Sequence, residues 1–355
     1  MRALFVYKYL DLGGVEAVLS ARLDGLPDLG VDAHVWFLRD GPGRALFEDK
    51  PTRTHIGGIH ELERYLDAAS PDLVITIDTE EAFPALRGVT ADQAVVIEIH
   101  TPYRENRLYL SGLDRLGVRA FLTPTAYQAS LVEKQTQSVA PTYVVPNPLD
   151  ASFAEPLHSP AVKPRVPVVA WVGRLDALKR WRDFIGIANV MNRGRDAEAE
   201  FWLVGKDNSG GGEARLMLEA IRKGVLHRLR WYRDIPHARM ARFFDALRES
   251  GGVVVSTSSE ESFGLGVAEA MARGCAVVVP RRSAFREVVE DRRHGLMYRP
   301  DSATDAAKCI RRLLEDNGLR EACGSQARAD ILDRHAPQKA LPRLAETLQM
   351  LSPGQ

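Results

Sequence analysis

The stretch from Gly251 to Pro280 reads GGVVVSTSSEESFGLGVAEAMARGCAVVVP, and it predicts a strand, a polar loop, a helix and a second strand. Val253–Val255 and Cys275–Val279 are apolar runs of the kind found in parallel strands that are buried on both faces. Ser262 is placed to cap the helix, and Gly274 suits the left-handed position at its end. The stretch therefore indicates a strand–helix–strand unit of an α/β fold.

Two carboxylates make this unit a candidate ligand site. Glu261 lies where the first strand meets the helix, at the edge where open α/β sheets bind ligands. Glu269 is the only charged residue between Phe263 and Ala272, so we expect it to be paired in the interior or to face a pocket. Each carboxylate alone is also explained without a ligand, Glu261 by the helix dipole and Glu269 by an ion pair or solvent. Their combination around a glycine-rich turn favours a site.

The composition is typical of a globular, reduced and soluble chain. Its 355 residues suffice for two α/β domains, and 45% of them are hydrophobic. No apolar run approaches the roughly 20 residues that cross a bilayer, and the N-terminal MRALFVYKYLDLGG turns acidic too soon for a signal peptide. The three cysteines (Cys275, Cys309 and Cys323) have no metal-binding spacing, and their odd number argues against a disulfide framework. These features predict a cytoplasmic protein.

Charge is unevenly distributed along the chain, although its net charge is zero. Residues 1–155 carry 14 Lys and Arg against 22 Asp and Glu, whereas the other 200 residues carry 33 against 25. The basic second half suits an anionic ligand such as a nucleoside diphosphate. The acidic first half argues against nucleic-acid binding and against docking on an anionic membrane.

The nine residues from Glu261 to Glu269 resemble the E-x7-E signature of the family 4 retaining glycosyltransferases. The resemblance extends over nearly the whole chain, with its sharper motifs in the second half. It implies the GT-B fold, in which two Rossmann-like, doubly wound α/β domains face a cleft and a C-terminal helix crosses back to the first domain. The expected parts are an N-terminal acceptor-binding domain at 1–155, a linker at 156–166, a C-terminal nucleotide-sugar-binding domain at 167–338 and the returning helix at 339–355.

A second motif, Gly173-Arg-Leu-Asp-Ala-Leu-Lys179, follows the predicted strand Val168–Val172 and is similar to the family's G-R-L-x3-K phrase. Fixed cations at a strand end would stabilise the charge that grows on a departing diphosphate. The alternative is that Arg174 and Lys179 are ordinary surface cations, and their occurrence together with the two glutamates favours the binding interpretation.

The resemblance assigns donor-binding roles in the second half of the chain. Arg174 and Lys179 would hold the diphosphate, Glu261 the sugar hydroxyls and Glu269 the ribose. Backbone groups near the start of the helix would contact the sugar or the β-phosphate, and a turn after a strand would contact the base. The residues expected there are Phe263, Gly264, Leu265 and Gly266 for the helix start, and Arg233 and Ile235 for the turn.

In the first half, Gly13-Gly14 follows the predicted strand Arg2–Tyr7 and begins a helix, whose N-terminal amides could hold an anion. The loop is similar to the family's GGxE loop, which makes Gly14 a candidate donor contact; a plain tight turn is the alternative. His100 ends another strand, and a structural histidine is as good an explanation as a functional one. The resemblance implies that His100 contacts the donor sugar and that Tyr103 and Arg104 line the acceptor pocket.

The sequence thus predicts a metal-independent, retaining glycosyltransferase, specifically a hexosyltransferase. It would need no cofactor and would transfer sugar from a nucleoside-diphosphate donor to the hydroxyl of a soluble natural-product or saccharide acceptor. Asp78-Thr-Glu-Glu81 lacks the D-x-D spacing of a metal site, so we assign it no metal. The catalytic set is His100, Arg174, Lys179 and Glu261, none of them an obvious nucleophile. The alternatives are a GT-B sugar-nucleotide epimerase or hydrolase and a non-catalytic, nucleotide-binding partner subunit.

Overall fold

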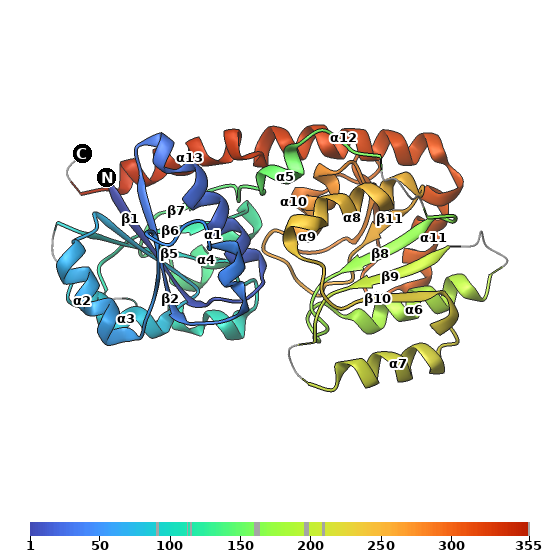
Figure 1. Ribbon diagram of the computed structural model, residues 1–355, viewed down its shortest axis with the longest axis horizontal. Coiled ribbons are helices and arrows are strands. Elements are labelled where there is room, and N and C mark those ends of the chain that lie inside the picture. Colours follow the sequence, from blue (N-terminus) through green and yellow to red (C-terminus); the bar gives the residue numbers. More distant parts are fainter. Residues whose placement is uncertain are drawn as a thin grey trace. The chain divides into compact units, whose positions relative to one another are not determined.

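The computed structural model describes residues 1–89, 92–111, 113, 116–159, 164–194, 199–207 and 210–353. They form two compact units, one of Met1–Ala151 with Arg334–Gln355 and the other of Ser152–Asp333 (Figure 1). Each unit is built on one parallel sheet with Rossmann-like topology. Across these described ranges, no helix combines the length and the apolarity that a membrane crossing requires.

The first unit contains a sheet ordered β3-β2-β1-β4-β5-β6-β7 over its described residues, and every neighbouring pair is parallel. The chain reverses its direction of winding between β1 and β4, so their carboxyl ends form the switch point where such sheets bind ligands. The strands are β1 (Arg2–Tyr9), β2 (Asp32–Arg39), β3 (Thr54–Ile56), β4 (Leu73–Ile77), β5 (Ala94–Glu98), β6 (Val118–Thr123) and β7 (Thr142–Val144).

The last helix of the chain belongs to the first unit. Its Leu341, Leu344 and Leu348 share a buried cluster with Leu19 and Leu23 of the first helix. The apolar positions of the last helix recur at helical spacing, which explains why one of its faces is buried. The helices of this unit are α1 (Gly14–Gly25), α2 (Ile59–Ala69), α3 (Phe83–Leu86), α4 (Ala126–Thr136) and α13 (Pro337–Leu351).

The second unit contains a parallel sheet ordered β10-β9-β8-β11-β12-β13 over its described residues. Its switch point lies between the neighbouring strands β8 and β11, at the centre of the sheet. The strands are β8 (Val168–Val172), β9 (Glu200–Val204), β10 (Leu229–Tyr232), β11 (Val253–Val255), β12 (Val277–Pro280) and β13 (Gly295–Tyr298).

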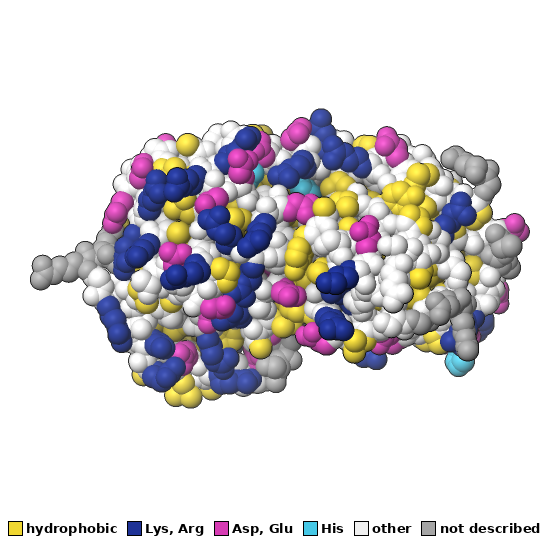
Figure 2. Space-filling view, turned by 180° about the vertical axis from the view of Figure 1, so that it is seen from behind, with side chains coloured by type: hydrophobic (Ala, Val, Ile, Leu, Met, Phe, Trp, Pro, Cys, Tyr) yellow, Lys and Arg dark blue, Asp and Glu magenta, His cyan; other side chains and the backbone are white. Residues whose placement is uncertain are grey.

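Helices cover both faces of this second sheet, with two of them, α8 and α9, on the face opposite α6 (Figure 1). The space-filling view shows many Lys and Arg side chains over this unit, in line with the basic composition of the second half of the chain (Figure 2). The helices are α5 (Ala151–Ala154), α6 (Trp181–Asn192), α7 (Gly212–Arg222), α8 (His237–Glu249), α9 (Leu265–Ala272), α10 (Phe285–Val288), α11 (Ala303–Glu315) and α12 (Asn317–His335), of which α5 and α12 run across the unit boundaries.

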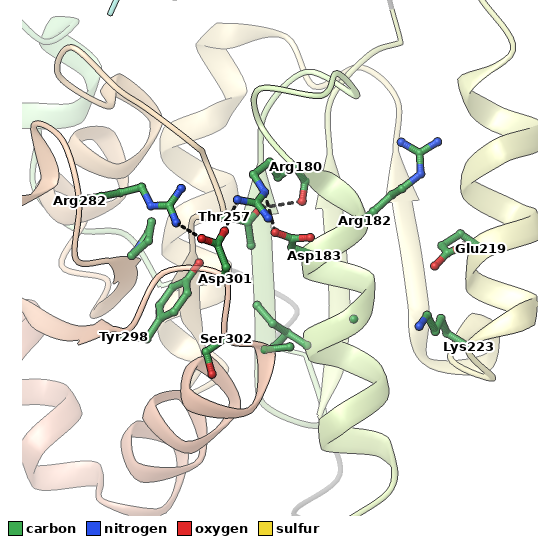
Figure 3. A pocket seen from close by; sticks show the side chains of 14 residues that line it. Arg180, Arg182, Asp183, Glu219, Lys223, Thr257, Arg282, Tyr298, Asp301 and Ser302 are labelled. Atoms are coloured by element: carbon green, nitrogen blue, oxygen red, sulfur yellow. Dashed lines mark hydrogen bonds and ion pairs between the residues drawn. The ribbon is translucent and has the colours of Figure 1, made fainter.

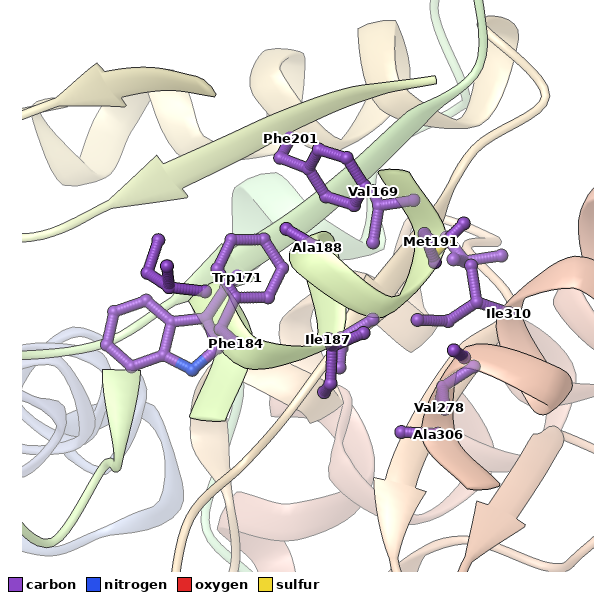
Figure 4. Close-up of a cluster of buried hydrophobic side chains, with 14 of the residues drawn as sticks. Val169, Trp171, Phe184, Ile187, Ala188, Met191, Phe201, Val278, Ala306 and Ile310 are labelled. Carbon is purple, nitrogen blue, oxygen red and sulfur yellow. The ribbon is translucent and has the colours of Figure 1, made fainter. Parts of the chain in front are cut away.

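An aromatic core supports the second sheet from its α6 side (Figure 4). The ring of Phe184 lies 6.3 Å from that of Trp171 on β8 and 6.1 Å from that of Phe201 on β9. Trp171 is buried, and its indole Nε1 donates a hydrogen bond to Thr257 Oγ1 at 2.8 Å. The core therefore anchors the loop that follows β11, because a buried indole needs this acceptor.

The chain changes unit at Ala151 and at Asp333, a few residues before the boundaries at 155 and 338 that the sequence suggested. The cause at the first boundary is α5, whose Phe153 is fully buried and lies 6.4 Å, ring to ring, from Phe244 of the second unit. Residues 160–163 of the expected linker lie outside the described residues.

We expect the protein to lose stability in mild acid because of His335. Burial lowers the pKa of His335 to about 4, whereas an unfolded histidine titrates near pH 6.5. The unfolded chain therefore binds more protons below about pH 6.5, so stability falls as the pH drops from there towards 4, by about 3 kcal/mol in total. Urea denaturation at pH 7.5 and pH 4.5 measures this difference.

H335Q removes the buried histidine. H60Q is its matched control, because the side chain of His60 is 91% exposed. We expect H335Q to be less sensitive to pH than the wild type and H60Q to behave like the wild type. A wild-type pH dependence in H335Q would contradict the assignment.

Candidate active site

A short ion pair joins the two sequence motifs of the second unit. Lys179 Nζ lies 2.5 Å from Glu261 Oε1, and the two side chains are 26% and 13% exposed. Lys179 follows β8 and Glu261 follows β11, and these two strands are neighbours at the switch point. The fold thus brings together, at one carboxyl edge, two residues that are 82 positions apart in the sequence.

The loop that carries Lys179 is shaped by Asp176. One carboxylate oxygen of Asp176 accepts the backbone N–H groups of Leu178 at 3.0 Å and of Lys179 at 2.7 Å, and the other accepts Arg174 Nε at 3.0 Å. Aspartate commonly closes such turns with its own side chain. The side chain of Arg174 remains 57% exposed. The loop therefore holds Lys179 in place and leaves Arg174 accessible to a ligand.

Helix α9 begins at Leu265, later than the Ser262 cap that the sequence suggested, and no side chain caps it. The reason is Gly264, which takes the left-handed conformation (φ 89°) and turns the chain sharply into the helix. A Cβ atom at Gly264 would lie 2.7 Å from the ring of Phe285. The first N–H groups of α9 have no acceptor within the helix, so they are available at the same edge as Glu261.

We expect G264A to lower the unfolding temperature for two reasons. Alanine would have to adopt a strained positive φ, and its Cβ would clash with the Phe285 ring. A non-glycine residue in this conformation costs about 1–2 kcal/mol before the clash is added. G266A is the matched control, since its Cβ would find Val172 Cγ1 only at 3.9 Å. Differential scanning fluorimetry compares the two variants, and equal unfolding temperatures would refute the steric account.

Glu269 is the other motif carboxylate, and it is buried in α9 with 6% exposure. Its Oε1 lies 3.1 Å from Nε2 of His237, the first residue of α8, which explains how the apolar helix tolerates a carboxylate. The ring of His237 lies 5.5 Å from that of Phe153. Sequence reasoning missed His237, because it follows a turn without a motif; its position at the start of a helix just after β10 was the available signal.

Arg233 and Ile235 lie in the turn between β10 and α8. The Arg233 guanidinium pairs with Glu213 and lies 4.9 Å from the centre of the Trp231 ring. Ile235 is half-buried and precedes His237 by two positions. This turn is therefore connected to Glu269 through His237, whereas the Arg233 side chain is engaged with α7.

In the first unit, Gly14 is the first residue of α1, at the carboxyl end of β1. Buried Glu16 closes the preceding loop, because its carboxylate accepts the N–H of Asp11 at 2.9 Å. A Cβ at Gly13 would lie 2.7 Å from the same carboxylate, so the glycine leaves room for Glu16. The N-terminus of α1 therefore has a defined loop in front of it.

His100 is held by a buried carboxylate. Its Nε2 lies 2.7 Å from Glu98 Oε1, and Glu98 also accepts both terminal nitrogens of buried Arg22, at 2.7 and 2.6 Å. Burial alone would raise the pKa of Glu98, but Arg22 and His100 hold it well below its usual range. The ring nitrogen that faces this ionised carboxylate carries the hydrogen. The sequence analysis did not identify Glu98 or Arg22.

The loop after His100 is fixed by Asp78. Asp78 accepts the N–H of His100 at 3.0 Å and the hydroxyl of Tyr109 at 3.2 Å, and burial raises its pKa. Tyr103 and Arg104 lie further along this loop, where Tyr103 is half-buried and Arg104 is exposed. The structure thus places His100, Tyr103 and Arg104 on one segment of the first unit and the remaining candidates, apart from Gly14, in the second.

Comparison with solved structures defines the class of fold. The chain is similar to Anabaena HepE in complex with UDP and glucose, with a TM-score of 0.81, 19% identity and coverage of 99% of this chain and 100% of that chain. It is also similar to a sucrose-phosphate synthase from Thermosynechococcus elongatus, with a TM-score of 0.79, 16% identity and 99% coverage of both chains. The fold is therefore GT-B, which confirms the two Rossmann-like domains predicted from the sequence.

Sequence comparison relates part of the chain to a family of glycosyltransferases. Residues 157–330 match the family Glycosyl transferases group 1. A D-inositol 3-phosphate glycosyltransferase of Corynebacterium jeikeium is 29% identical over 189 residues, which are 52% of this chain and 44% of that protein. A 2-deoxystreptamine N-acetyl-D-glucosaminyltransferase of Streptomyces fradiae is 30% identical over 161 residues, 45% of this chain and 36% of that protein. The matches thus span less than half of these relatives, and residues 157–330 are the part of the chain that is similar to the group 1 family.

Proposed function

We propose that the protein is a metal-independent, retaining glycosyltransferase that moves a hexosyl group from a nucleoside-diphosphate donor to an acceptor hydroxyl. The observation that carries the proposal is the 2.5 Å pair of Lys179 and Glu261, formed by two separate loops at the switch point of the second sheet. The glycosyltransferase names of the sequence relatives and the UDP-glucose complex of HepE support a sugar-nucleotide donor.

The donor diphosphate would bind between the cations of β8 and the start of α9. The Lys179 ammonium has three hydrogens, so it can bind Glu261 and a phosphate oxygen together. Arg174 offers a planar, exposed guanidinium five residues earlier. The N–H groups of Leu265 and Gly266 would add the positive end of the α9 dipole. These groups would stabilise the leaving diphosphate without a metal ion.

The nucleoside and the sugar would be recognised by the two motif carboxylates. Glu269 keeps one oxygen on His237, and its second oxygen would accept a ribose hydroxyl. Glu261 would accept a sugar hydroxyl beside the diphosphate. Ile235 and Arg233 would border the base, and Phe263 and Gly264 would support the sugar at the turn into α9.

The first unit would supply the remaining contacts. Because the Nε2 hydrogen of His100 is directed to Glu98, Nδ1 is the nitrogen that can accept a hydroxyl of the donor sugar. We propose that Gly14 meets the diphosphate and that Tyr103 and Arg104 meet a soluble natural-product or saccharide acceptor. In the transfer, the bond from the anomeric carbon to the phosphate oxygen breaks while the acceptor oxygen bonds on the same face, and the acceptor proton passes to the leaving phosphate.

A thermal-shift panel tests the donor class, using UDP, GDP, ADP and dTDP, each with magnesium and with EDTA. A nucleotide at a hundredfold excess over its Kd contributes about 2.7 kcal/mol of stability. We expect one nucleotide to stabilise the protein equally in both buffers. Stabilisation that requires magnesium would contradict metal independence, and no shift from any of the four would contradict the proposed donor site.

The stereochemistry is tested with the matching sugar nucleotide and an acceptor panel. We expect the anomeric proton of the product, observed by NMR, to show the configuration of the donor. An inverted product would contradict retention. Release of free sugar at the same rate without any acceptor would identify a hydrolase instead.

A further inference from the structure

A cavity of about 280 Å³ lies beside the proposed donor site, on the α6 and α11 side of the second sheet. It is lined by residues at or just after the ends of β11, β12 and β13, by residues of the first turns of α6 and α11, and by Glu219 and Lys223 at the end of α7. Lys179 and Glu261 are not among its lining side chains. Four of its charged residues, Arg180, Asp183, Arg282 and Asp301, form one cluster, and Arg182, Glu219 and Lys223 line it further along α6 and α7 (Figure 3).

One carboxylate, that of Asp301, bridges the two arginines of this cluster. Its Oδ1 accepts Arg180 Nη1, and its Oδ2 accepts Arg282 Nη2 at 2.7 Å, as the dashed lines in Figure 3 show. Arg180 also pairs with Asp183 at 2.7 Å. The arginine side chains are 29% and 22% exposed, whereas that of Asp301 is 58% exposed, so the bridge is shielded on its arginine side and open to solvent at the carboxylate.

The hydroxyl groups of the cavity are already bonded to the protein. Thr257 Oγ1 donates to the backbone carbonyls of Lys179 at 2.8 Å and Arg180 at 3.1 Å, and Tyr298 donates to the carbonyl of Ser256 at 2.9 Å. Two guanidinium groups, two carboxylates and two hydroxyls thus already have partners within the protein. These groups therefore connect chain segments to one another more than they offer an open surface for recognition. We call the cluster of Arg180, Asp183, Arg282 and Asp301 the clamp.

The clamp adjoins Lys179 in the sequence and is connected to Glu261 through Ser283. Arg180 is the neighbour of Lys179 in the sequence, and Arg282 is the neighbour of Ser283. Ser283 Oγ accepts the backbone N–H of Glu261 at 3.2 Å. Asp301 thus ties the segment that carries Lys179 to the segment that supports Glu261.

We propose that Asp301 is a positioning residue for the donor site, which sets the separation of the loops that follow β8 and β12. It would act through Lys179 and Glu261 rather than by touching the substrate. This inference rests on the proposed function, because the loops it holds carry the proposed diphosphate and sugar contacts. With the bridge intact, the side chains of Lys179 and Glu261 reach one ligand together. Without it, the distance between the two loops is no longer fixed.

The variant that tests this role is D301N. Asp301 has φ 64°, a left-handed conformation that asparagine tolerates, so the change removes the charge without straining the backbone. Because small displacements of substrate-positioning groups have large effects on rate, we expect kcat/KM for the donor to fall about tenfold. R282M removes the other side of the bridge and should give the same result if D301N folds poorly.

D291N is the matched control, because Asp291 pairs with Arg281, the neighbour of Arg282, at 2.7 Å. We expect D291N to retain wild-type kcat/KM, so an equal loss in D291N would overturn the specific role of Asp301. Wild-type kcat/KM in both D301N and R282M would also overturn it.

A double-mutant cycle with K179A separates positioning from a general structural defect. If Asp301 acts through Lys179, D301N should lower kcat/KM about tenfold in the wild-type background and have little further effect in K179A. Equal losses in both backgrounds would overturn the proposal and leave the proposed function intact. If K179A itself had wild-type kcat/KM, the proposed function would fail first.

Discussion

Replacing Lys179 with alanine is expected to lower kcat about 100- to 1000-fold, the usual effect of removing one preorganised group that stabilises charge in a transition state. Lys179 lies 2.5 Å from Glu261, which holds its ammonium group at the switch point. Initial rates with the donor identified by the nucleotide panel measure the effect. K308A is the matched control, because Lys308 is an exposed lysine on α11 of the same unit.

The two residues of the pair should not contribute independently. E261A removes the partner of Lys179 as well as the proposed sugar contact. We therefore expect kcat of the double variant K179A/E261A to be only slightly lower than that of the less active single variant. Fully additive losses would show that the residues act separately. Wild-type turnover in K179A would show that the diphosphate binds elsewhere.

Replacing Arg273 with alanine is expected to destabilise the second unit by about 3–5 kcal/mol. Arg273 is fully buried, and its guanidinium bonds Asp245 at 3.0 and 2.7 Å. It also donates to the carbonyls of Glu155 at 2.8 Å and Pro156 at 3.1 Å, so it fixes the segment after α5. The variant leaves Asp245 as a buried carboxylate without its cation, which accounts for most of the loss.

Urea denaturation of R273A measures this loss against R222A. Arg222 pairs with Glu219 at 2.6 Å, but its side chain is 69% exposed, so its removal should change stability very little. The double variant R273M/D245L removes both charges, and we expect it to recover part of the stability. Equal stability of R273A and R222A would contradict the importance of the buried pair.

Much of the fold could be predicted from local patterns. The apolar, β-branched runs Val168–Val172 and Val253–Val255 are strands with the predicted bounds. Such runs are informative because a parallel sheet buried on both faces leaves few other sites for them. The motif residues Lys179 and Glu261 lie together for the same reason, since both follow strands that end at one edge of the sheet.

The features that sequence reasoning missed depend on distant contacts. Helix α9 begins at Leu265 because Gly264 takes the left-handed conformation, and the nearby Phe285 ring, which leaves no room for a Cβ there, is not adjacent in the sequence. The Glu98–Arg22 pair joins residues 76 positions apart, and no local pattern distinguishes Arg22 from a surface arginine. His237 follows a turn that has no recognisable motif, and only the fold places it against Glu269.

The most direct test of the proposed donor site is a calorimetric titration of UDP, GDP, ADP and dTDP, each in buffer that contains EDTA. It compares the wild type with K308A and with the double variant R174A/K179A. We expect one nucleotide to bind the wild type and K308A with the same Kd, and to bind the double variant at least about tenfold more weakly, the loss of roughly one charge-assisted hydrogen bond. The same Kd in all three proteins would contradict a diphosphate site at Arg174 and Lys179.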